Sequence, residues 1–194
     1  MFRAAPRPRL VGAFADWARD RRGSAAIEFA FVAPVLVMIL LGSIEAVDLY
    51  RAQRAAVVTA NTVADLTSRA KVMDDDEIAL ITAAAETLLE SYVAISNVRI
   101  IITSVQADSD DGDQWVRWSA SNISGAAYND DEAFDPEMEL NAPLRNGDTM
   151  IVAELSFSYA PRMSSFMFQS ITFERFAFRS PRYVPRIPYS PQDP

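Results

Sequence analysis

The chain has 194 residues, of which half are hydrophobic and 23% are charged, and it contains neither cysteine nor histidine. This composition argues against a wholly disordered chain and allows one folded domain with a core plus a membrane segment. The lack of cysteine excludes a disulfide framework and a thiolate metal site, and the lack of histidine removes the commonest general base and metal ligand. We therefore expect no catalytic residue, no metal site and no cofactor.

The charge of the chain is unevenly distributed. Residues 1–23 contain six arginines and two aspartates, a net of +4, so the total of −8 leaves −12 for residues 24–194. A basic leader before an apolar run predicts that the leader stays in the cytoplasm and that the acidic remainder lies outside. Arg51 and Arg54, which follow the apolar run, weaken this prediction without reversing it. The acidic remainder also argues against binding to nucleic acid.

An apolar run predicts a transmembrane helix over about residues 25–45. The twenty residues from Ala25 to Ile44 contain one charge, Glu28. Twenty helical residues extend roughly 30 Å, which is the thickness of the hydrocarbon core. Pro34 lies inside the run, and membrane-spanning helices tolerate proline. A cleaved secretory signal is the competing interpretation, but the sequence after the run offers only a poor cleavage site.

The helical pattern continues beyond this apolar run. Residues 45–71 contain no glycine or proline and are rich in alanine. We therefore predict one long helix over residues 24–71, with an apolar stripe on its outer part that packs on the outer domain. Three residues of this stripe are expected to be buried against a sheet, namely Ala56, Val63 and Leu66.

A second helix is predicted to begin after Asp74. Its side chain can cap the helix, Glu77 three residues later completes a capping-box spacing, and acidic residues favour a helix N-terminus. The residues expected on one apolar face of this helix are Ile78, Ile81, Ala85, Leu88 and Leu89.

The sequence then changes to a strand pattern. Residues 97–106 and 115–121 are predicted to form a hairpin around an acidic loop. The loop contains Asp108, Asp110, Asp111 and Asp113, but its glycine is fifth rather than sixth and its twelfth residue is a serine, unlike an EF-hand. We interpret it as a solvated turn, with calcium binding as the alternative.

Two further strands are predicted, over residues 149–161 and 171–180. In the first, Ile151 and every second residue up to Tyr159 share one face, and Glu154 lies on the other. The predicted fold class is α+β, with the outer domain over residues 72–180 and a mostly antiparallel sheet. The five prolines from residue 181 onward predict an extended or disordered tail over residues 181–194.

The residues RRGSAAIEFAFVAPVLVMILLG resemble the class III signal of type IV pilins, in the variant of Tad (tight adherence) systems. That pattern has a basic leader, a glycine, a small residue, a glutamate at the fifth mature position and an aromatic residue, which here are Gly23, Ser24, Glu28 and Phe29. The continuation into residues 60–69, the second helix and residues 147–161 resembles TadE-like pseudopilins, the minor pilins of Tad, or type IVb, pilus systems. The leader is longer than many, and the outer domain is far larger than that of a short major pilin.

The resemblance implies a pilin-like outer domain and a minor pseudopilin that acts in Tad-type pilus assembly, adhesion or surface attachment. It implies cleavage after Gly23 by a prepilin peptidase at the cytoplasmic face. It also implies that Glu28 pairs with the Ser24 amine of a neighbouring subunit, whereas a glutamate that snorkels near a helix N-terminus is the simpler alternative.

The partners implied are the prepilin peptidase, other pilin or pseudopilin subunits, the inner-membrane assembly platform and membrane lipid. The implied location is the bacterial inner membrane, single-pass, with a periplasmic C-terminal domain, or the extracellular pilus. An anchored extracytoplasmic binding or sensor domain without a pilus role is the alternative. A secreted enzyme with a cleaved signal is a third reading, for which the sequence offers no active site.

Overall fold

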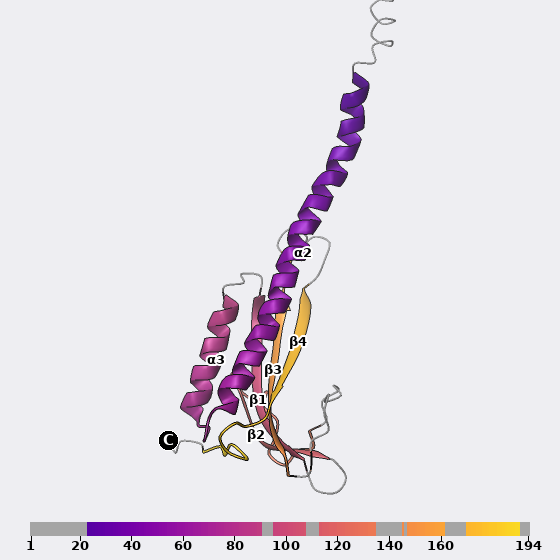
Figure 1. Cartoon of the computed structure of the whole chain (residues 1–194). Helices are drawn as coiled ribbons and strands as arrows, with labels where there is room; N and C mark the ends of the chain where they lie inside the picture. The colour runs from indigo at the N-terminus through magenta and orange to yellow at the C-terminus, as the bar shows by residue number, and fades with distance from the viewer. Residues whose placement is uncertain are drawn as a thin grey trace, which may run out of the picture. The chain divides into compact units, whose positions relative to one another are not determined.

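The computed structural model describes residues 23–90, 95–107, 113–134, 145, 147–161 and 170–190. Three parts of the sequence-based predictions lie outside this description: residues 1–22 of the leader, residues 108–112 of the acidic loop with three of its four aspartates, and residues 191–194 of the tail. The chain divides into two compact units, Met1–Ile44 and Glu45–Pro194. The second unit contains the sheet and the second helix (Figure 1).

The long helix α2 comprises Ser24–Ser68, which confirms one continuous helix that ends three residues before the predicted Lys71. Pro34 lies inside it without ending it. At the C-terminal end, the backbone N–H of Arg182 donates to the carbonyl of Ser68 at 2.9 Å, so a segment distant in sequence satisfies one of the last carbonyls of the helix.

The helix α3 comprises Asp75–Glu90 and begins where the acidic run predicts. A carboxylate oxygen of Asp74 accepts a hydrogen bond from the backbone N–H of Glu77 at 2.8 Å, which confirms Asp74 as the cap. Three acidic residues occupy the first turn, where they interact favourably with the helix dipole.

The four strands form one antiparallel sheet in the order β2-β1-β3-β4, as the α+β prediction requires. A register shift between Ser104 and Val105 interrupts the pairing of β1 with β2, the predicted hairpin. The strands are β1 (Ile95–Ala107), β2 (Gln114–Ser121), β3 (Thr149–Tyr159) and β4 (Ile171–Arg179).

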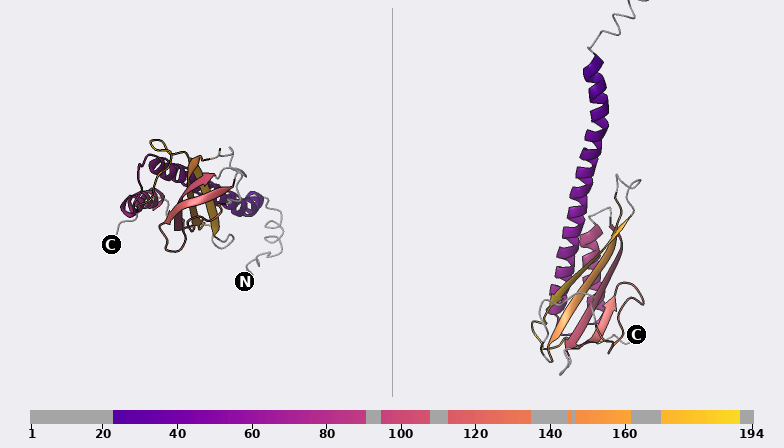
Figure 2. Two further views of the ribbon diagram at one scale, coloured as in Figure 1. Left: turned by 90° about the horizontal axis from the view of Figure 1, so that it is seen from below. Right: turned by 90° about the vertical axis from the view of Figure 1, so that its right-hand side faces the viewer.

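The main core lies between the helices and one face of the sheet, here called the helix face. Both α3 and the part of α2 from Glu45 onward cover this face (Figure 1), as the end-on view of Figure 2 also shows. The predicted alternation of β3 is confirmed, because its residues from Ile151 to Tyr159 in steps of two are all buried here. Small side chains of α2 face them: Ala52, Ala55, Ala56, Ala60, Val63 and Ala64.

A smaller core cluster lies on the opposite face of the sheet. It contains Val105, Val116, Met150 and Val152, with Phe134 from the loop that follows β2 packed against them. Because both faces of the sheet are covered, the polar residues of β3 are also removed from water. Glu154 and Ser156 are each 7% exposed, although they lie on the face away from the helices.

Two predicted core residues lie at the surface instead. Leu66 on α2 is 42% exposed and Leu88 on α3 is 45% exposed, so the expectation that Leu66 is buried against the sheet is wrong. The buried stripe of α2 runs through Ala56, Ala60, Val63 and Ala64, and Leu66 lies to one side of it. Alanine at these positions lets the helix approach the sheet closely, so the stripe is narrower than a pattern of large residues would suggest.

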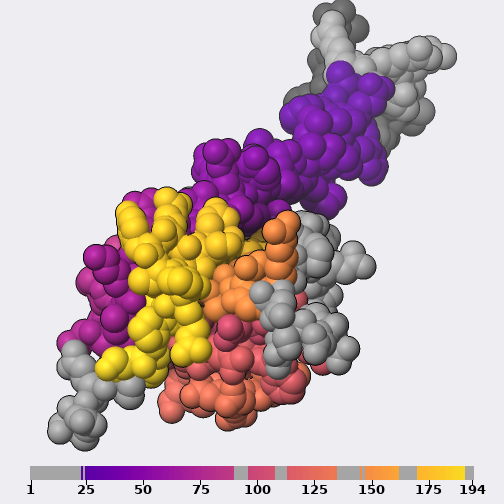
Figure 3. Space-filling model, turned by 60° about the horizontal axis from the view of Figure 1, so that its bottom comes forward, coloured from indigo at the N-terminus to yellow at the C-terminus, as the bar shows by residue number. Residues whose placement is uncertain are grey.

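The proline-rich segment from residue 181 to residue 190 is packed against the domain. Ile187 is fully buried, and its carbonyl accepts a hydrogen bond from Trp118 Nε1 at 2.8 Å. The backbone of Met73 bonds to Pro188 and Ser190 at 2.9 Å in both directions. In Figure 3 the yellow residues, which include β4 and this segment, lie against the purple residues of the helices.

Candidate processing and assembly site

The predicted processing and assembly residues lie at the beginning of α2. Gly23 immediately precedes the helix, which begins at Ser24, and Glu28 and Phe29 follow. Glu28 is four residues after Ser24, so it lies about 6 Å further along the helix axis on the same side. The structure thus brings these four residues together within the first turns of one helix, as their spacing already required.

The fold itself does not require glycine at position 23. A Cβ atom added to Gly23 meets no heavy atom within 4 Å in the described part of the chain, so none of the described residues excludes a side chain there. Gly125 and Gly147 differ, because their φ angles of 76° and 81° are strained for other residues. Packing and backbone conformation therefore give no reason within the chain for the glycine that precedes α2.

The first half of α2 exposes a continuous apolar surface. Every side chain described from Ala25 to Ile44 is exposed except that of Ala33, which is partly exposed. Phe29 and Phe31 are 65% and 77% exposed. In the part of the chain that the structure describes, α2 is the one helix long and apolar enough to cross a membrane, with a mean hydropathy of 2.3 over its most apolar stretch. An apolar surface of this size needs lipid or another protein to cover it.

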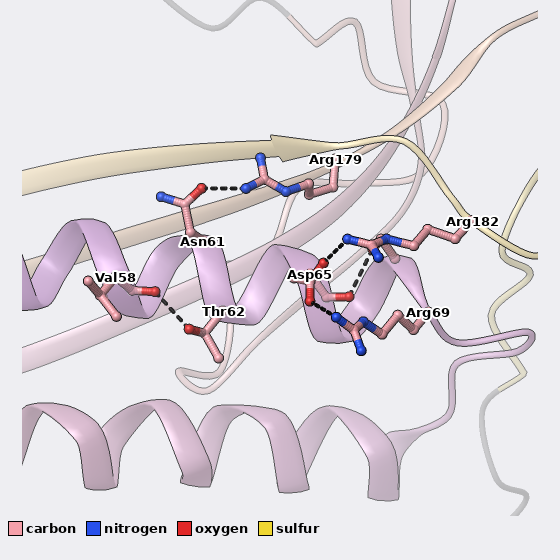
Figure 4. Close-up of polar contacts among 8 residues, drawn as sticks. Val58, Asn61, Thr62, Asp65, Arg69, Arg179 and Arg182 are labelled. Carbon is pink, nitrogen blue, oxygen red and sulfur yellow. Dashed lines mark hydrogen bonds and ion pairs between the residues drawn. The ribbon is translucent and has the colours of Figure 1, made fainter.

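A polar cluster attaches the last turns of α2 to the segment after β4 (Figure 4). Asp65 is at its centre, with one carboxylate oxygen bonded to Arg69 at 2.5 Å and the other bonded to Arg182. No basic residue lies in the last turn of α2 itself, so these two arginines place positive charge at the negative end of the helix. The cluster joins the last turns of α2 to the segment that follows β4.

One turn earlier, α2 is also bonded to β4. The side-chain oxygen of Asn61 accepts a hydrogen bond from a guanidinium nitrogen of Arg179 at 2.8 Å (Figure 4). Thr62 beside it donates to the carbonyl of Val58 at 2.8 Å, within the helix. The contact between Asn61 and Arg179 could not be predicted from local sequence patterns, because the two residues are 118 positions apart.

A second polar group lies on the face of the sheet away from the helices. Glu154 accepts hydrogen bonds from Arg99 at 3.1 Å and from the Tyr128 hydroxyl at 2.9 Å. Glu174 lies 3.7 Å from the same arginine. Burial, followed by the negative charge of Glu154, raises the pKa of Tyr128 to about 12. The carboxylate of Glu154 is therefore held in a network with Arg99 and Tyr128, and its position as the one charged residue of β3 was the only local signal of this network.

The described residues contain no group of three or more acidic side chains placed to hold a metal ion. Asp108, Asp110 and Asp111 of the acidic loop lie outside the described residues, so a cation site there stays untested. The absence of catalytic activity and of a cofactor likewise stays a prediction.

Residues 23–65 match the family model of TadE-like proteins. The match confirms the resemblance seen in the sequence over α2, from the glycine before it almost to its last turn. It does not extend to α3 or the sheet. No curated protein and no solved structure matched the chain.

The match covers 43 of the 194 residues, so the similarity to TadE-like proteins is shown for α2 and not for the whole chain. TadE-like proteins are a pilus-associated structural family. The matched segment contains both halves of α2, the apolar half that could span a membrane and the half that packs on the sheet. A single-pass membrane anchor at the N-terminal side of the domain is consistent with both observations.

Proposed function

We propose that this TadE-like chain is a minor pseudopilin that a prepilin peptidase cleaves after Gly23. The mature protein would begin at Ser24, remain anchored in the bacterial inner membrane by α2, and act in assembly of a Tad-type pilus, in adhesion or in surface attachment. Its partners would be other pilin or pseudopilin subunits and the inner-membrane assembly platform. The leader would lie in the cytoplasm and the domain in the periplasm, or in the extracellular pilus after assembly.

The observation that carries this proposal is the coincidence of three boundaries. The TadE-like match begins at residue 23, α2 begins at Ser24, and the basic leader ends at Gly23. Cleavage there would remove the leader and leave the helix complete. Because the fold gives no internal reason for glycine at this position, recognition by a protease is a suitable explanation for it.

The proposed role of Glu28 follows from its position. It is an exposed carboxylate near the start of an apolar helix. A carboxylate at the centre of a spanning helix costs about 2.5–3.5 kcal/mol on insertion scales, and less near the interface. Cleavage would create a free amine on Ser24, and pairing of Glu28 with that amine on a neighbouring subunit would offset the cost. The same pair would set the axial register between adjacent helices.

The N-terminus of protein extracted from membranes tests the processing step. We expect sequencing to begin at Ser24. An intact Met1 would contradict processing and favour an anchored binding or sensor domain. A terminus near Val47 would instead show a cleaved secretory signal and contradict the retained anchor.

The assembly step is tested separately by Glu28→Gln. We expect this variant to be inserted and cut after Gly23, yet to lose most of its crosslinking to other pilin-like subunits, because the amine has lost its charged partner. Glu28→Asp, which keeps the charge, is the matched control and should retain more crosslinking. Normal complex formation by processed Glu28→Gln protein would show that the glutamate merely tolerates the membrane interface.

A further inference from the structure

The sheet has two edge strands, and the described residues leave much of each outer edge without a backbone partner. On β2, residues 131–134 cover the first half, with the backbone of Val116 bonded to Asp131 and Glu132 at 2.8 and 2.9 Å. Beyond the register shift at Ser104 and Val105, the backbone N–H of Asn122 donates to the carbonyl of Ile100. Because the residues of an antiparallel strand alternately point their backbone groups toward and away from the neighbouring strand, those of Ser119 and Ser121 point away from β1. No described residue hydrogen-bonds to these groups, and among the described residues β4 pairs with β3 alone. Open edges of this kind are templates for another strand.

A groove of about 530 Å³ lies beside the open half of β2, between this strand and α3. Two carboxylates line it. Glu86 accepts a hydrogen bond from the Asn122 side chain at 2.7 Å, and Asp75 accepts one from the Tyr189 hydroxyl. Both donors are neutral, and neither carboxylate pairs with an arginine or lysine in the described part of the chain. The groove therefore carries two uncompensated negative charges.

The other edge strand carries the complementary charges on the same face of the sheet. Arg175 and Arg179 pair across the sheet with Leu155 and Ile151, which are residues of the helix face. Arg175 donates to the neighbouring carbonyl of Glu174 at 2.7 Å, and Arg179 bonds to the carbonyl of Phe178 and to Asn61. Among the described residues, neither arginine forms an ion pair with a carboxylate.

The register of the sheet places these charges at matching heights. The side chain of Asn122 bonds to Glu86, and its backbone bonds to Ile100. Ile100 pairs with Leu155 and Leu155 pairs with Arg175, so these residues form one row across the strands.

The second row begins at Trp118 and runs through Ser104 and Ile151 to Arg179. Tyr189, which bonds to Asp75, stacks on Trp118 with ring centroids 5.7 Å apart. Glu86 is thus level with Arg175, and Asp75 is level with Arg179.

The topology allows one sheet to continue into another. In an antiparallel sheet of four strands, β2 and β4 run in opposite directions. A second copy displaced across the strands, without rotation, therefore brings its β4 antiparallel to β2. All copies keep the same orientation, as proteins inserted into one membrane with one topology must.

We propose that the occupant of the open β2 edge is the β4 edge of a second copy of this chain, with Arg175 at Glu86 and Arg179 at Asp75. The contact joins two different surfaces, so it repeats from copy to copy rather than closing as a symmetric dimer. The right-handed twist of sheets would curve the resulting array. This interface involves neither cleavage after Gly23 nor Glu28, so it can fail or succeed independently of the proposed processing.

Charge exchange in the full-length protein in detergent tests the proposal. Glu86→Lys alone and Arg175→Glu alone should each weaken self-association, measured by sedimentation, at least tenfold. An equimolar mixture of the two variants should restore it, because each new charge then faces its opposite. Lys71→Glu, at an exposed position to which the proposal assigns no partner, is the control and should change nothing. A mixture that associates no better than its components would overturn the pairing, and so would a wild-type chain that stays monomeric.

Crosslinking tests the direction of the contact, and the chain contains no cysteine to interfere. Glu86→Cys mixed with Arg175→Cys should form a disulfide-linked dimer on oxidation, whereas either variant alone should not. Glu86→Cys mixed with Lys71→Cys is the matched control and should crosslink no more than background. Equal crosslinking in both mixtures, or strong crosslinking of Glu86→Cys with itself, would contradict the proposed arrangement.

Discussion

The two halves of α2 belong to one helix but have opposite surroundings. From Ala25 to Ile44 the apolar side chains are exposed all round the helix, and from Glu45 to Ser68 a stripe of alanines and Val63 is buried against the sheet. Both halves are helical, so helix formation does not distinguish them. The first half is uniformly apolar, which suits lipid or neighbouring helices, whereas the second half alternates polar and small apolar residues, which suits one protein surface.

This difference shows that the same residue type has different consequences along one helix. A large apolar side chain in the first half adds to a membrane-facing surface. In the second half the buried stripe is mostly alanine, which sets the distance between helix and sheet, and Leu66 lies to one side of this stripe and is exposed. Substitutions matched between the halves can separate these two roles.

The largest expected effect is at the residue before the first half. Gly23→Leu should leave nearly all of the protein with its leader attached, because the proposed peptidase would no longer accept the bulky residue. Gly23→Ala is the control and should still be cut. Mass spectrometry of membrane-extracted protein measures both, and cleavage of Gly23→Leu between residues 23 and 24 at the normal rate would show that the proposed site is wrong.

The second effect compares one substitution in both halves. Val63→Asp should destabilise the domain by about 3–4 kcal/mol, because it places an unpaired charge in the core. Val37→Asp should leave the stability of the domain unchanged and instead lower membrane insertion, at a cost of about 2.5–3.5 kcal/mol.

Tryptophan fluorescence during unfolding reports on the domain through the buried Trp118, and membrane fractionation reports on insertion. Leu66→Asp is the control within the second half and should cost less than about 1 kcal/mol, since this side chain is exposed. Equal losses for Val63→Asp and Leu66→Asp would contradict the burial that distinguishes the two positions.

A smaller effect is expected at the end of the second half. Asp65→Asn should destabilise the domain by about 1 kcal/mol, because the carboxylate joins Arg69 and Arg182 in a partly exposed network. Asp48→Asn is a matched control, since its 3.6 Å pair with Arg51 is exposed and lies within one helix. Denaturant unfolding at low and high salt should show a salt-dependent loss for Asp65→Asn alone. An equal response in both variants would exclude a special role for Asp65.

The smallest effect concerns the sheet on which the second half packs. The pKa of Tyr128 is raised from 10.0 to about 12, by burial first and then by Glu154. A tyrosine whose pKa is raised in the folded state stabilises the fold when the pH is below its pKa in the unfolded state. This contribution is lost as the pH rises from about 10 to about 12. Glu154→Gln should lower the pKa of Tyr128 while burial keeps it above 10.0, and the tyrosinate absorbance during a pH titration measures this. An unchanged titration would show that the charge of Glu154 does not act on Tyr128.

Local sequence patterns predicted most of the secondary structure. The cap at Asp74, the single helix from residue 24 onward, the hairpin and the alternation of β3 depend on neighbouring residues, and the structure confirms each. The burial of Glu154 was not predicted, because alternation shows which residues share a face but not whether the far face is covered. The packing of Ile187 was hidden by prolines, which restrict the backbone without indicating whether another surface covers it.

The sequence by itself determined the basic leader, the apolar span and the residues Gly23, Ser24, Glu28 and Phe29, because these features depend on composition and spacing along one helix. Only the tertiary structure decided that Arg182 reaches Asp65 and that Glu86 is level with Arg175. The reason is that strand register and helix placement are set by packing between segments far apart in the chain. Such packing brings together charges that no local pattern relates.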